Sequence, residues 1–167
     1  MKPPNPDPEN PVDVLIRRFI LGAVGILLTT GTAKVWSGLG SARLLAVADP
    51  IVGIEFRHLM LVAGFAEIAI AIFCTTSRRQ VPALGLLAWL STNFLLYRLG
   101  LWWMGWHRPC SCLGNLTDSL RISPQAADNA MKAALAYLLV GSCACLMLLW
   151  KRGRHPQPPR EPAVGLP

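Results

Sequence analysis

Residues 59–76 read LMLVAGFAEIAIAIFCTT, and Glu67 is the one charged side chain in this apolar run. A helix needs about 20 such residues to cross the hydrocarbon core of a bilayer. It also satisfies its own backbone hydrogen bonds, which lipid cannot satisfy. The run therefore predicts a membrane-spanning helix with a carboxylate near its middle.

Three more apolar runs of this kind occupy residues 19–33, 81–97 and 133–150. Over the 167 residues, 53% are hydrophobic and 15% are charged, against about 25% charged in an ordinary soluble domain. We therefore predict an all-α, polytopic membrane protein, a four-transmembrane-helix bundle with a cysteine-containing outer loop between helices 3 and 4. An alternative for the first run is a cleaved signal peptide, because basic residues precede it and small residues end it.

The membrane domain is expected to cover residues 15–150. Residues 1–14 and 151–167 are rich in proline, and we expect both segments to be disordered because they contain little apolar surface to bury. No second domain is expected, because the four helices are too few and too short to make two domains.

Lysine and arginine are denser in residues 1–18, 77–80 and 151–167 than in residues 34–58 and 98–132. Basic loops remain in the cytoplasm. We therefore expect both termini in the cytoplasm of a bacterium and the outer loop in the periplasm, with the bundle in the inner membrane. Basic helix ends at the cytoplasmic surface account for much of the net charge of +7, so the lipid bilayer is the expected partner and no nucleic acid is expected.

Cys110 and Cys112 stand one residue apart in the predicted outer loop. A disulfide across one residue closes a small, strained ring that exchanges easily. On the oxidising side of the membrane such bonds persist. We therefore predict that both thiols are catalytic residues in disulfide exchange; the alternative is that they are ordinary loop thiols or a static bridge.

A metal site is the other chemistry that this loop suggests, because His107 with Cys110 and Cys112 would be soft ligands for copper or zinc. The one-residue spacing makes a poor tetrahedral site and no fourth ligand is evident, so no metal is predicted. The remaining thiols, Cys74, Cys143 and Cys145, are expected to be small apolar core residues whose redox role the sequence leaves open. Cys143 and Cys145 should face opposite sides of their helix, about 200° apart.

Glu67 is a third candidate catalytic residue, because an ionised carboxylate within a membrane span needs a partner or water. Asn93 lies at a similar depth in the third helix, and either Lys34 or Arg98 could extend from an outer helix end toward the carboxylate. Glu67 could relay protons released by thiol oxidation, or bind a quinone head, with Asn93 and Arg98 as further candidate ligands. The alternatives are a carboxylate that only holds the bundle together, and solute transport through Glu67 and Asn93 in an oligomer.

The order of these parts over residues 15–150 resembles the MauE group within the DoxX-like membrane proteins. The resemblance rests on the small-residue pattern Gly31, Thr32, Ala33 and Lys34, on residues 64–67, and on the loop motif Cys110, Ser111, Cys112, Leu113 and Gly114. Leu113 stands where that group has an aromatic residue. This difference weakens the case that position 113 has a ring-stacking role in this chain, but both thiols and the glycine of the motif are in place.

MauE proteins, which act in methylamine utilisation, are linked to maturation of the disulfide-rich small subunit of methylamine dehydrogenase, alongside a thioredoxin-like partner. The resemblance implies a membrane accessory protein in thiol–disulfide redox maturation of exported proteins, exchanging disulfides with a thioredoxin-like partner. A quinone in the bilayer, as in relatives of vitamin K epoxide reductase, is the weaker alternative, because the chain lacks the cysteine pair spaced by two residues that those enzymes use next to their quinone. The alternative is a non-catalytic membrane scaffold with structural cysteines. The sequence leaves open whether the protein is an enzyme, which client it serves, the direction of electron flow and the oligomeric state.

Overall fold

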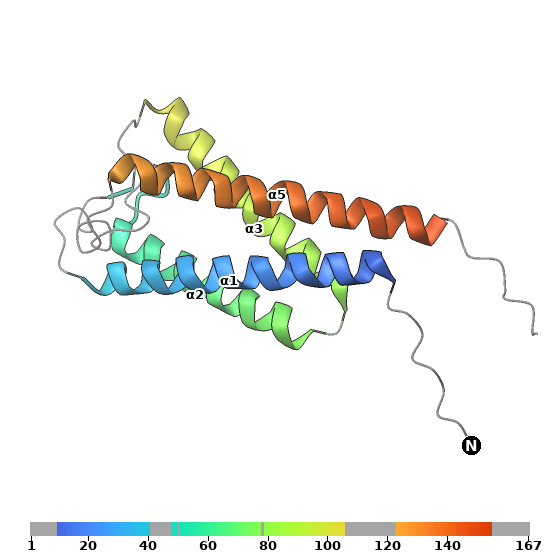
Figure 1. The fold of residues 1–167 in the computed structure, drawn as a ribbon. Coiled ribbons are helices and arrows are strands. Elements are labelled where there is room, and N and C mark those ends of the chain that lie inside the picture. Colours follow the sequence, from blue (N-terminus) through green and yellow to red (C-terminus); the bar gives the residue numbers. More distant parts are fainter. Residues whose placement is uncertain (1–9, 41–47, 50, 78, 106–122, 155–167) are drawn as a thin grey trace, which may run out of the picture.

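The computed structural model of the chain describes residues 10–40, 48–49, 51–77, 79–105 and 123–154. These residues are helical apart from short turns, and the one bridge found in them joins Ala48 to Glu55. The predicted all-α class is confirmed for this part of the chain. The helices shown in Figure 1 are α1 (Pro11–Leu39), α2 (Phe56–Thr76), α3 (Gln80–Trp103) and α5 (Pro124–Arg154).

Three of these helices are long and apolar enough to cross a membrane, namely α2, α3 and the part of α5 from Gln125 to Arg152. The prediction of a helical membrane protein is confirmed to that extent. The helix α1 is not among the three, and charged residues lie near both its ends, Asp13 and Arg17 at the start and Lys34 at the end. A fourth span formed by α1 stays a prediction.

The helices extend past the predicted apolar runs. Helix α1 begins at Pro11, inside the segment expected to be disordered, because the Asn10 side chain accepts a hydrogen bond from the Val12 amide at 3.3 Å and proline fits the first helical position. Helix α5 begins at Pro124, ahead of the apolar run 133–150, and the Ala126 amide donates to Ser123 Oγ at 3.3 Å. It continues to Arg154 because basic side chains suit the last turn of a helix.

The bundle consists of two helix pairs, α1 with α2 and α3 with α5, and contacts between the pairs are sparser (Figure 1). The first pair crosses at Gly31 and Gly64. A Cβ atom on Gly64 would lie 2.9 Å from the Gly31 carbonyl oxygen. Glycine therefore lets the two backbones approach more closely than any other residue would, as is common between membrane helices.

Both the start of α1 and the end of α5 lie at one end of the bundle, where Arg152 Nη1 contacts Asp13 Oδ1 at 2.8 Å (Figure 1). Helix α2 ends and α3 begins at the same end. We call it the basic end, after its residues Arg17, Arg18, Arg79, Lys151, Arg152 and Arg154.

The apolar core fills the half of the bundle near the basic end. Most of its buried residues come from the first half of α1, the second half of α2, the first half of α3 and the second half of α5; they include Ile16, Ala23, Ala71, Leu84, Leu87 and Cys145. The opposite half holds a cavity between the two helix pairs. The helices are therefore closely packed at one end and leave a hollow toward the other.

Candidate functional site

The loop thiols Cys110 and Cys112 lie outside the described residues, and so does His107. The helix ends on either side are described. Trp103 ends α3 and Pro124 begins α5, and both lie at the end of the bundle opposite the basic end (Figure 1). The predicted cysteine loop is therefore attached at that end on both sides.

Glu67 meets Lys34 where α1 and α2 cross. Lys34 follows Gly31 by three residues on α1, and Glu67 follows Gly64 by the same spacing on α2. Residues three apart share a helix face, so the contact of the two glycines brings the ammonium and the carboxylate together as an ion pair. Both are buried, with Lys34 5% and Glu67 2% exposed. The expectation that a basic residue reaches Glu67 is confirmed for Lys34.

Two neighbours complete the environment of this pair. The Thr30 hydroxyl donates to Glu67 Oε2 at 2.9 Å, while Lys34 occupies Oε1. The Lys34 ammonium also lies 4.8 Å from the centre of the Phe94 ring on α3, a cation–π arrangement. Each carboxylate oxygen thus has a donor. A buried charge pair of this kind depends on both members, because removal of either leaves an uncompensated charge.

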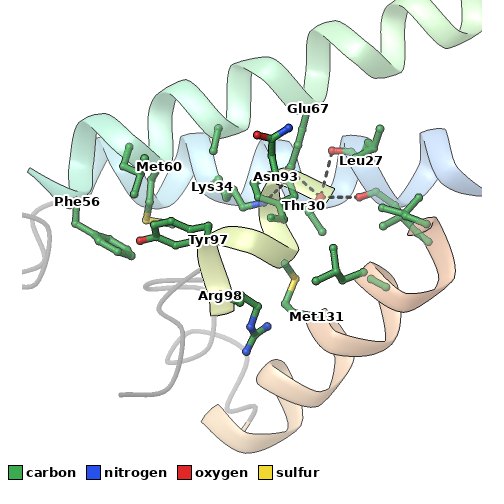
Figure 2. A pocket seen from close by; sticks show the side chains of 17 residues that line it. Leu27, Thr30, Lys34, Phe56, Met60, Glu67, Asn93, Tyr97, Arg98 and Met131 are labelled. Atoms are coloured by element: carbon green, nitrogen blue, oxygen red, sulfur yellow. Dashed lines mark hydrogen bonds and ion pairs between the residues drawn. The ribbon is translucent and has the colours of Figure 1, made fainter. Parts of the chain in front are cut away.

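The pair forms part of the wall of a cavity of about 320 Å³ (Figure 2). Most of the lining is apolar and comes from all four helices, with Leu27, Met60, Phe94, Met131 and Leu138 among its side chains. Among the described residues, the polar ones that line it are Thr30, Lys34, Glu67, Asn93, Tyr97 and Arg98. An apolar cavity with a few convergent polar groups is the usual form of a site for a small molecule.

Asn93 shares this cavity with Glu67, as their similar predicted depth suggested. Its amide nitrogen donates to the Trp89 carbonyl of its own helix at 2.7 Å. Arg98, the other candidate partner of Glu67, pairs instead with Asp128 of α5, which also accepts from Lys132 Nζ at 2.7 Å. The reason is that α3 packs chiefly on α5, so an α5 carboxylate is the nearer partner.

Sequence reasoning missed Asp49, a 2% exposed residue in the turn before α2. Its Oδ1 accepts from the amides of Ile51 at 2.8 Å and Val52 at 3.0 Å, and its Oδ2 accepts the Tyr97 hydroxyl hydrogen. The turn and α3 are joined in this way beside the cavity. The sequence held a weak indication of this role. Aspartate is favoured in turns, where its carboxylate accepts hydrogen bonds from backbone amides two or three residues further along the chain.

The three described cysteines are all free thiols. Cys74 and Cys145 are buried, as expected of core residues, and Cys74 Sγ lies 3.9 Å from the Ala83 carbonyl oxygen. The same expectation is wrong for Cys143, which is exposed. The predicted opposite facing of Cys143 and Cys145 explains this difference, since the rotation that buries one turns the other outward.

No protein-family model, no curated protein and no solved structure matches the chain.

Proposed function

We propose that the protein is a membrane accessory factor in thiol–disulfide redox maturation of exported proteins, exchanging disulfides through Cys110 and Cys112. The exchange partner is a thioredoxin-like protein; alternatively, a quinone takes up the two electrons and two protons that are released when the two thiols close to a disulfide. The observation that carries this proposal is the pair of thiols one residue apart in the segment that joins two helices apolar enough to cross a membrane. The MauE-like arrangement of motifs supports the same assignment.

The proposed topology has four spans in a bacterial inner membrane, with the basic end in the cytoplasm. Exposed Arg17, Arg79 and Lys151 at that end support it, because arginine and lysine are retained on the cytoplasmic side. The opposite end, with the cysteine loop, then faces the periplasm. In this topology helix α1 is the fourth span: residues 19–33 are apolar, and Lys34, the charged residue that follows them, is paired with Glu67.

In the proposed exchange, a thiolate of one loop cysteine attacks a sulfur of the partner's disulfide. One S–S bond forms between the two proteins, and the partner's other sulfur leaves as a thiolate. The second loop cysteine then attacks the mixed disulfide, which closes the Cys110–Cys112 bond and releases the partner as a dithiol. Run in reverse, the same steps oxidise the partner, so electrons and protons balance in either direction.

The experiment that tests the exchange is the trapping of mixed disulfides in intact membranes. We expect the single variants Cys110→Ser and Cys112→Ser to accumulate a covalent adduct with the partner, because the resolving thiol is missing. The matched control is Cys143→Ser, which removes an exposed thiol of α5 and should leave no adduct. If neither loop variant forms an adduct and the double variant still supports client maturation, the protein is a scaffold instead.

Orientation is tested separately by labelling sealed cells with a membrane-impermeant maleimide. The chain used lacks Cys74, Cys143 and Cys145, each replaced by serine. We expect Cys110 and Cys112 to be labelled from outside after reduction. Labelling from the cytoplasmic side alone would reverse the proposed topology.

A further inference from the structure

The cavity beside Glu67 is placed where a molecule dissolved in the bilayer could enter it. It lies between the two helix pairs, which contact each other sparsely, in the half of the bundle away from the basic end. On α3, Asn93 stands between Trp89 and Leu96 along the helix, and both of these are 61% exposed. Asn93 thus lies where the exposed face of α3 meets the cavity. At about 320 Å³, the cavity falls in the range of small-molecule sites, which starts near ~300 Å³.

The charges around the cavity indicate that the ligand is neutral. Two cations occur among the described residues that line it, and both are already paired, Lys34 with Glu67 and Arg98 with Asp128. A carboxylate or phosphate ligand would have to displace one of these carboxylates and leave it without its partner, which is costly at a buried site. A neutral ligand leaves both pairs in place.

Hydrogen-bond donors in the cavity wall indicate a ligand with acceptor oxygens. The Lys34 ammonium has three N–H groups, of which one faces Glu67. The Asn93 amide has two, of which one donates to the Trp89 carbonyl. Among the described residues, the other N–H groups of these side chains are left for a ligand. The Phe94 ring and the aliphatic lining supply a surface for a flat apolar ring.

We propose that this cavity binds the ring head of a lipid-soluble quinone. A quinone is neutral and flat, and its polar groups are two carbonyl oxygens that only accept hydrogen bonds, which matches the paired charges, the apolar walls and the donors of Lys34 and Asn93. The use of this quinone as the electron acceptor of the loop thiols rests on the function proposed above, whereas its binding does not.

The test uses the full chain in phosphatidylcholine nanodiscs, titrated with a ubiquinone analogue that carries one isoprenoid unit, with heats measured by calorimetry. Ala134 lines the cavity, and Ala136 on the same helix is exposed. Ala134→Leu should fill part of the cavity and weaken binding about tenfold or more, equivalent to 1.4 kcal/mol. The matched control Ala136→Leu should bind like the unchanged chain. Equal binding by the two variants overturns the proposal.

A second variant and two further measurements test the donor role of Asn93, the neutral charge of the ligand and the independence of binding from the loop thiols. Asn93→Ala removes the amide of an exposed residue that lines the cavity, and it should weaken binding several-fold; unchanged binding overturns the assignment of Asn93 as a donor to the ligand. Oleate, an anionic amphiphile, should not compete; full displacement of the quinone by oleate overturns the neutral-ligand assignment. The Cys110→Ser/Cys112→Ser chain should bind the quinone unchanged. Absence of saturable binding in a chain whose thiols still exchange overturns the quinone site and leaves the proposed function intact.

Discussion

The crossing of α1 and α2 gives the sharpest test of the fold, through the substitution Gly64→Ala. The new Cβ atom would lie 2.9 Å from the Gly31 carbonyl oxygen and 3.2 Å from Lys34 Cβ. Backbone atoms cannot rotate away, so the helices must separate. Overpacking of this kind costs about 1–3 kcal/mol, against a gain of about 0.5–1 kcal/mol when alanine replaces glycine within a helix.

The matched control is Gly85→Ala on α3, where a new Cβ atom would meet nothing within 4 Å. Both variants share the gain in helix propensity, so their free energies of unfolding should differ by the overpacking term alone, about 1–3 kcal/mol in favour of Gly85→Ala. The measurement is unfolding of the purified protein in mixed micelles, followed by loss of helical circular dichroism. If Gly64→Ala proves as stable as Gly85→Ala, the close glycine crossing is refuted.

Three other substitutions test contacts between the helices. Glu67→Ala should lower the free energy of unfolding by about 3–5 kcal/mol because Lys34 is left buried without its partner, whereas replacing both by methionine should be nearly neutral, as unfolding titrations would measure. Tyr97→Phe removes the bond to the turn before α2 and should cost about 1–2 kcal/mol, with faster hydrogen exchange confined to that turn. Gly141→Ala would place a Cβ atom 2.1 Å from the Phe19 ring; it should destabilise the protein, and adding Phe19→Leu should restore stability in a double-mutant cycle.

The existence of the helices was predictable because apolar composition is a local property of the sequence. The residues at which the helices end were less predictable. Arg98 and the residues up to Trp103 belong to α3 although the predicted run stopped at residue 97, and Arg98 in this extension pairs with Asp128 of α5. That pairing depends on which helices are neighbours, which the apolar runs do not specify.

The candidate site was predictable in part. A lone carboxylate in an apolar run marks a residue that needs a partner, so Glu67 could be singled out without a structure. Glu67 pairs with Lys34 rather than Arg98 because α1 and α2 cross at Gly31 and Gly64. The sequence shows that each charged residue follows its glycine by three positions, but this spacing predicts the ion pair only when α1 and α2 are known to be neighbours. The cavity could not be foreseen, because it results from helix pairs that share a core at one end and separate toward the other.

Lys34 and Glu67 belong to the first two helices of the chain, so their ion pair can form before α3 has been synthesised. This order matters during synthesis, because a charged side chain near the centre of a helix costs about 2.5–3.5 kcal/mol to insert through the translocon. Two helices that leave the ribosome in succession and dock at their glycines can present a neutral hairpin to lipid. In the proposed four-span topology, insertion of α2, which carries Glu67 near its centre, is then expected to depend on Lys34 of α1, so that Lys34→Ala should lower the fraction of chains in which α2 is inserted, as protease protection would measure.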